Sequence, residues 1–143
     1  MKTIKIGNKE YKYDCNAYTY ILFKKVFNRS IFDDLRVLQE YLIKQAIILN
    51  DIKQKVPNIT EKELESNITR LMMEDNIEKF VESATRIVYI LIKEYNDIDE
   101  YEDWLRTVPP LKINDDWIVE VAEFAVNCFC WPRFIKGIRK NKF

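Results

Sequence analysis

The chain has 143 residues, with 23 basic and 23 acidic side chains and no histidine. This length suits one domain with a real core, and the zero net charge excludes a global field that attracts nucleic acid or an anionic membrane. Without histidine the chain lacks the most common general base and the usual catalytic zinc ligand, so we expect no enzyme activity, no cofactor and no metal. Its three cysteines are too few for a disulfide framework, and no signal peptide or membrane span is apparent, so we expect a cytoplasmic protein.

The first 14 residues predict a β-hairpin. Gly7 and Asn8 suit a two-residue loop between two short strands. That register gives the hairpin one apolar face, which must lie on helices because an isolated hairpin is only marginally stable in water. The residues of this face are Ile4, Ile6, Tyr11 and Tyr13.

A helical body is predicted over residues 15–131, which makes the chain a single, mainly α domain followed by a basic tail at 132–143. Capping residues, prolines and apolar spacing place six helices. Asn16, Ser30 and Asn114 are the expected N-caps of the first, second and last helices, and Asn28 ends the first. Ser30 with Asp33, Thr60 with Glu63, and Asp99 with Glu102 have capping-box spacing. The predicted helices span 16–27, 31–53, 61–73, 76–95, 99–107 and 115–130.

The central element of this body is the helix that ends near Tyr95. From Ile77 onward its apolar residues recur at helical spacing over five turns and widen near the end. We therefore expect this helix to form the floor of the core, with Ile87 in the middle of the buried seam.

The cysteine pair Cys128 and Cys130 is the one suggestive metal-binding spacing. Residues two apart on a helix point about 200° from each other, so these thiols cannot share one metal ion. We expect Cys128 to be buried and Cys130 to be less buried.

The charges are unevenly distributed near the end of the chain. Ten acids and two bases lie between Glu94 and Glu123, whereas five bases and no acid follow Glu123. The basic tail could bind RNA or an acidic partner, fold back on the acidic stretch, or contact the acidic stretch of another copy in self-association. The composition leaves these alternatives open.

The order of these segments resembles a known family. The segments are KTIKIGNKEYKY, NAYTYILFKKVFNRSIFDDL, VYILIKEYNDIDEYEDWL and NDDWIVEVAEFAV. Together they are similar to the tail assembly chaperones of long-tailed phages and prophages of Gram-positive bacteria. In that family a hairpin precedes a helix ending in an F-G-[KR]-[DS] turn, which here is Phe27-Asn28-Arg29-Ser30. A second shared feature is an acidic step before a W-L pair, here Trp104-Leu105.

The resemblance implies a non-enzymatic accessory protein that is absent from the finished virion. Such a protein binds the tape measure protein and keeps it soluble while tail tube protein subunits polymerise around it. The family brings no catalytic residues. The alternative from another class is a small helical nucleic-acid-binding or regulatory protein of a mobile element, with the basic tail as its contact.

A chaperone of this kind needs exposed apolar residues beyond those of its own core. Candidates lie on the first and last long helices, although each could equally contact a neighbouring helix or a second subunit. These protein-binding candidates are Tyr18, Ile21, Leu22, Val26, Val119, Phe124 and Val126.

Overall fold

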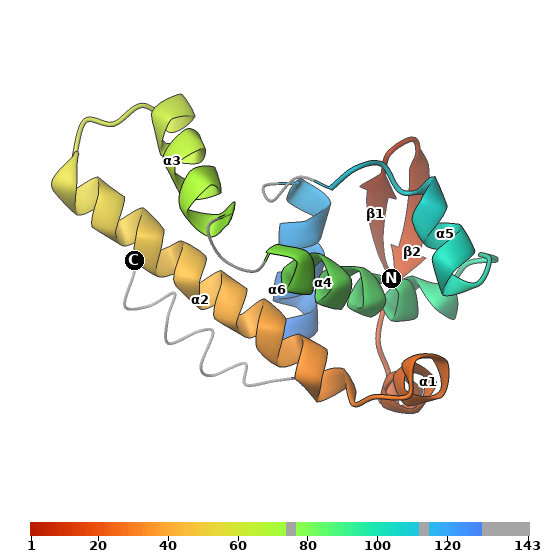
Figure 1. Cartoon of the computed structure of the whole chain (residues 1–143). Helices are drawn as coiled ribbons and strands as arrows, with labels where there is room; N and C mark the ends of the chain where they lie inside the picture. Colours follow the sequence, from red (N-terminus) through yellow and green to blue (C-terminus); the bar gives the residue numbers. More distant parts are fainter. Residues whose placement is uncertain (74–76, 112–114, 130–143) are drawn as a thin grey trace.

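Six helices and one antiparallel hairpin make up the part of the chain that the computed structural model describes, which is residues 1–73, 77–111 and 115–129 (Figure 1). The predicted mainly α fold is therefore confirmed. The elements in chain order are β1 (Lys2–Ile6), β2 (Lys9–Tyr13), α1 (Ala17–Phe27), α2 (Ile31–Lys55), α3 (Glu61–Met73), α4 (Ile77–Lys93), α5 (Tyr101–Thr107) and α6 (Asp116–Phe129). The predicted basic tail, the predicted cap Asn114 and Cys130 lie outside the described residues.

The hairpin has the predicted register. Ile4 pairs with Tyr11 and Ile6 pairs with Lys9, and the face that carries Ile4, Ile6, Tyr11 and Tyr13 is buried. Gly7 has a φ of 62°, a conformation that glycine adopts without steric cost. A Cβ atom there would also lie 3.0 Å from the ring of Pro109, so both backbone and space favour glycine in this loop.

The ends of α1 follow the prediction. The side chain of Asn16 accepts a hydrogen bond from the backbone N–H of Tyr18 at 2.9 Å, and the N–H of Asn16 donates to Thr19 Oγ1 at 2.9 Å. At the other end Asn28 has a left-handed backbone with a φ of 53°, and its N–H donates to the Lys24 carbonyl at 2.8 Å.

Other predicted caps are only partly correct. Ser30 caps α2 by accepting from the Phe32 N–H, but its predicted capping-box partner Asp33 makes no return bond. Thr60 Oγ1 accepts from the Glu63 N–H at 3.2 Å, which is half of the predicted box. α5 begins after Glu100 and has no side-chain cap, because the predicted cap Asp99 lies one residue too early.

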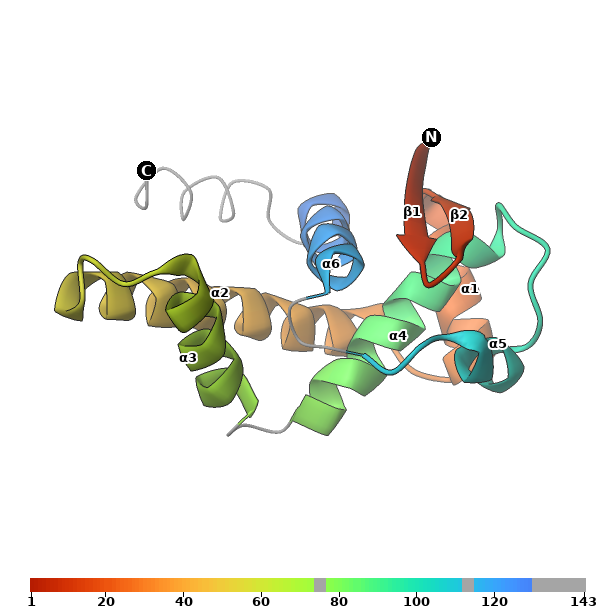
Figure 2. The same cartoon turned by 90° about the horizontal axis from the view of Figure 1, so that it is seen from above.

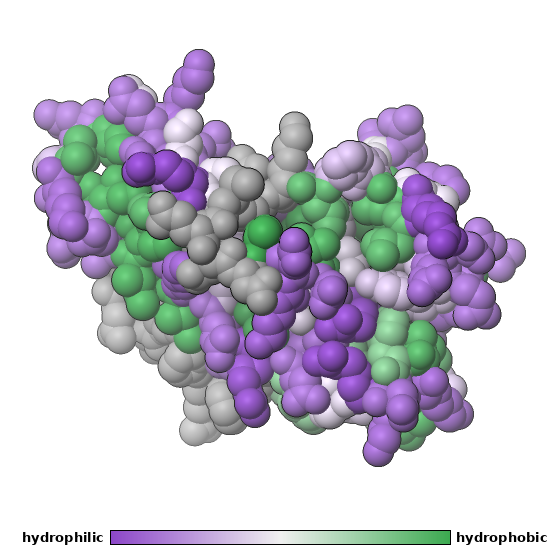
Figure 3. All heavy atoms as spheres, viewed as in Figure 1, coloured by the Kyte–Doolittle hydropathy of each residue, from purple (hydrophilic) through white to green (hydrophobic). Residues whose placement is uncertain are grey.

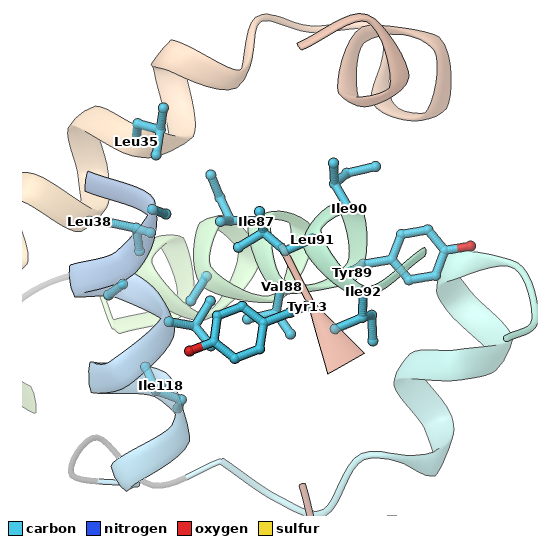
Figure 4. Packing of buried hydrophobic residues seen from close by; sticks show 14 of the residues in the cluster. Tyr13, Leu35, Leu38, Ile87, Val88, Tyr89, Ile90, Leu91, Ile92 and Ile118 are labelled. Carbon is cyan, nitrogen blue, oxygen red and sulfur yellow. The ribbon is translucent and has the colours of Figure 1, made fainter. Parts of the chain in front are cut away.

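The core is organised around α4, as predicted. α4 packs against α1, α2, α5, α6 and β2, so its last two turns are covered on most sides. Figure 4 shows side chains of α4, including Ile87, converging with Tyr13 of the hairpin and Leu35 of α2. Ile87 has no exposed surface, which confirms its place in the buried seam.

The outer half of α2 and the neighbouring α3 project from this core (Figures 1 and 2). Residues 42–71, which we call the arm, are all described, and none of them is buried. α2 contributes buried residues only up to Tyr41. Figure 3 shows hydrophobic residues at the surface over the outer part of this helix. The second helix is thus a core helix over its first half and a surface element over its second.

Candidate protein-binding surface

The outer side of α1 carries a row of apolar residues. Tyr18, Leu22 and Val26 follow one another at intervals of four residues, and Ile21 lies beside them, so all four share one side of the helix. Tyr18, Ile21 and Val26 are 42%, 53% and 39% exposed, whereas Leu22 is partly buried against the core. We call these four residues the α1 strip.

A positive charge borders the α1 strip. The Nζ atom of Lys25 lies 5.4 Å from the centre of the Tyr18 ring and 3.5 Å from its hydroxyl oxygen. Lys24 and Lys25 both belong to the last turn of α1. The surface therefore offers apolar contact with basic groups next to it, which suits an apolar segment that carries acidic neighbours.

Aromatic residues on the opposite side of α1 pack against the core. Phe23 is fully buried, and its ring centre lies 4.9 Å from that of Phe27. Phe27 in turn makes edge contacts with Tyr89 of α4 and Tyr101 of α5. These aromatic contacts hold α1 as a rigid element, so its outer side is a preformed surface.

The candidates on α6 do not form such a surface. Val126 is fully buried, so the prediction that it belongs to a binding surface is wrong. The ring of Phe124 packs edge-on against Tyr13 at 5.0 Å, with Lys2 Nζ 5.1 Å from its centre, and Val119 is partly buried. α6 has neighbours in α2, α4 and β1, so its buried face is wider than a single helical stripe.

A second exposed aromatic group lies where α1, α2 and α6 meet. Phe32 is 47% exposed, and its ring centre lies 5.7 Å from that of Tyr20. Tyr20 also contacts Phe129 at 5.0 Å. This group was not among the binding candidates predicted from the sequence, although Phe32 lies only two residues after the capping Ser30.

The residues that carry the family resemblance have structural roles. In the turn between α1 and α2, Phe27 packs in the aromatic cluster, Asn28 takes the left-handed conformation and Ser30 caps α2. Arg29 forms an ion pair with Asp34 at 3.1 Å. Trp104 is buried against Tyr11, Tyr89 and Tyr101. None of these residues belongs to the α1 strip.

The cysteines differ from the prediction. Cys128 is exposed, because it lies at the edge of the buried face of α6 near the end of the helix, whereas Cys15 is partly buried. Burial, together with a hydrogen bond to Cys128, raises the pKa of the Cys15 thiol to about 12. Cys15 is therefore a weak nucleophile at neutral pH. Across the described residues, no three histidine, cysteine or acidic side chains are grouped so that they could hold a metal ion.

A hollow of about 410 Å³ lies between β2 and the segment that leads into α5. Trp104 forms part of its wall, and the indole Nε1 is buried with no hydrogen-bond acceptor. The Asn96 amide nitrogen in the wall already donates to the carbonyls of Lys12 and Ile92. The lining residues are Lys9, Glu10, Tyr11, Asn96, Asp97, Ile98, Asp99, Trp104 and Thr107. This lining contains no cysteine or serine nucleophile.

None of the helices in the described part of the chain combines the length and apolar character needed to cross a membrane. Comparison with protein-family models, with curated proteins and with solved structures found no match to this chain.

Proposed function

We propose that this protein is a non-enzymatic phage tail assembly chaperone that acts in the host cytoplasm. In this proposal it binds the tape measure protein, and later the tail tube protein, through an apolar surface. The resemblance in the hairpin, the Phe27–Ser30 turn and the Trp104-Leu105 pair motivates the family. The observation that carries the binding role is the exposed α1 strip on a rigidly held helix.

The geometry of the α1 strip suits a helical partner. A row of side chains four residues apart forms a ridge that fits the groove of a second helix. A tape measure protein is a long, largely helical chain with apolar seams, and such seams aggregate when they are uncovered. The strip would cover one part of a seam, while Lys24 and Lys25 would face acidic residues beside it.

Co-expression with the cognate tape measure protein tests the proposal. We expect the tape measure protein to remain in the soluble fraction when this chain is present and to aggregate when an unrelated soluble protein of similar size replaces it. Equal solubility in both cases would remove the chaperone function. The contact should also persist in moderate salt because it is mainly apolar.

A further inference from the structure

Two cysteines that lie far apart in the sequence, Cys15 and Cys128, are brought together by the fold. Cys15 lies in the short segment between β2 and α1, and Cys128 lies in the last turn of α6. A hydrogen bond joins their side chains, and both thiols are free. We call these two residues the thiol pair. Neighbouring sulfur atoms are the arrangement from which a disulfide bond can form.

Aromatic contacts on both sides of the thiol pair hold the two segments against each other. The ring of Tyr13, two residues before the first thiol, packs edge-on against Phe124 of α6 with the ring centres 5.0 Å apart. The ring centres of Tyr20 of α1 and Phe129 of α6 are also 5.0 Å apart. Phe124 lies one turn before Cys128, and Phe129 directly follows it. The fold therefore keeps the two thiols together through contacts in which neither sulfur atom takes part.

The two members of the thiol pair differ in their access to solvent. Cys128 is exposed, whereas Cys15 is partly buried. An oxidant from solution therefore reaches the sulfur of Cys128 first, and Cys15 stands beside it as a second thiol. An exposed cysteine next to a second thiol is typical of reversible oxidation sites, because the second thiol reacts with the first oxidation product before oxidation becomes irreversible.

We propose that the thiol pair is a site of reversible oxidation, at which a peroxide converts the two thiols into a disulfide bond. The sulfur of Cys128 attacks one peroxide oxygen, the O–O bond breaks, and the other oxygen leaves as water or an alcohol with the thiol proton. The sulfur of Cys15 then attacks the sulfenic acid formed at Cys128, and the S–O bond breaks as the S–S bond forms. The hydroxyl group leaves as water with the proton of Cys15. Two electrons thus pass from the two sulfur atoms to the peroxide.

The disulfide bond would tie α6 to the segment that leads into α1. It would close a loop that contains most of the chain, and a bond of this kind restricts the unfolded state strongly. We therefore expect the oxidised protein to unfold at a higher temperature than the reduced protein. In a reducing compartment the free thiols are the resting form, so the bond would form only under oxidative conditions. This inference does not depend on the proposed chaperone function, because neither cysteine belongs to the α1 strip.

Disulfide mapping of the full wild-type chain after treatment with hydrogen peroxide tests the proposal. Remaining free thiols are blocked with iodoacetamide, and the protein is digested without reduction by chymotrypsin, which can cleave after Phe129 and so separate Cys128 from Cys130. We expect mass spectrometry to find Cys15 linked to Cys128 within single chains, and dithiothreitol to separate the two peptides. A predominant link through Cys130, links between chains, or irreversibly oxidised Cys128 beside a free Cys15 would overturn the proposal.

Serine substitutions are the matched controls, and the mapping of the wild type does not depend on whether they fold. Cys130→Ser should keep the link, whereas Cys15→Ser should abolish it and leave a sulfenic acid at Cys128 that dimedone traps. The rise in unfolding temperature on oxidation should be absent in Cys128→Ser and should be reversed by dithiothreitol in the wild type. Equal yields of the link in native protein and in protein oxidised in urea would show that the fold does not bring the two thiols together.

Discussion

Arg86 of α4 holds Asp34 of α2 with two hydrogen bonds, from Nε to Oδ2 and from Nη2 to Oδ1, each 2.8 Å long. Asp34 has no exposed surface, and Ser83 donates to the same carboxylate at 2.8 Å. Arg29, in the turn after α1, is a second cationic side chain at this carboxylate, with its Nη2 atom 3.1 Å from Asp34 Oδ1. One buried carboxylate therefore ties the α1–α2 turn and the start of α2 to the central helix.

We expect Asp34→Asn to be strongly destabilising. Removing one partner of a buried pair leaves the other charge without compensation, which costs about 3–5 kcal/mol. Asp33→Asn is the matched control, because this exposed neighbour occupies the same helical turn and should change stability by less than about 1 kcal/mol. Urea denaturation measures both values, and equal midpoints for the two variants would contradict the structural role of Asp34.

Ile87→Asp should be among the most damaging single substitutions. The new carboxylate would lie unpaired in the core, at a cost of several kcal/mol, about the upper end for a point substitution. Ile21→Asp places the same group on a side chain that is 53% exposed and should leave the midpoint nearly unchanged. Circular dichroism during chemical denaturation reports both, and a wild-type midpoint for Ile87→Asp would show that the seam is not buried.

The effect of a substitution at Asn28 on stability should depend on how well the new residue adopts the left-handed backbone conformation. Asn28→Gly should leave stability unchanged or increase it slightly, because glycine adopts a φ of 53° without steric cost. Asn28→Val should destabilise the fold by about 1–2 kcal/mol, the order expected for a branched side chain in this region. Thermal denaturation distinguishes the two, and equal midpoints would mean that α1 ends in another conformation in solution.

The protein should lose stability in alkali partly through Tyr41. Burial raises the pKa of this phenol to about 12, whereas an exposed tyrosine titrates near 10. The folded state therefore keeps a proton that the unfolded state loses, so this contribution is complete below about pH 10 and is lost as the pH rises towards about 12. Burial also raises the pKa of Tyr13 and Tyr101, which contribute in the same direction.

The control for this pH dependence is Tyr41→Phe, which keeps the stacked contact with Phe80 but has no ionisable hydroxyl. We expect the free energy of unfolding of this variant to fall less steeply than that of the wild type between about pH 10 and about pH 12. Identical slopes would exclude Tyr41 as a source of the alkaline instability.

Local rules were sufficient to predict most of the fold. Gly7-Asn8 selects a two-residue hairpin loop, and the loop then fixes the pairing of Ile4 with Tyr11. The spacing of apolar residues around Ile87 identified the helix at the centre of the core because burial on several sides widens the stripe. Asn16 and Asn28 marked the ends of α1 because each residue type has a strong local preference at its position.

The errors come from contacts between distant segments. Val126 looked like an edge residue on α6, but neighbours on more than one side of that helix bury it completely. Asp34 lies on the apolar side of α2 between Ile31 and Leu38, which could have indicated a buried carboxylate, but its partner Arg86 is 52 residues away. Nothing in the local pattern distinguishes the buried first half of α2 from its outer half, because both halves of this helix are rich in leucine and isoleucine.

Co-expression of single variants with the tape measure protein tests the α1 strip most directly. Ile21→Glu and Ile47→Glu place the same charge on exposed isoleucines of the α1 strip and of the arm, and both should keep the wild-type unfolding midpoint. We predict that Ile21→Glu loses the ability to keep the tape measure protein soluble, while Ile47→Glu retains it. Full retention by a folded Ile21→Glu variant would contradict the assignment of the α1 strip as the binding surface.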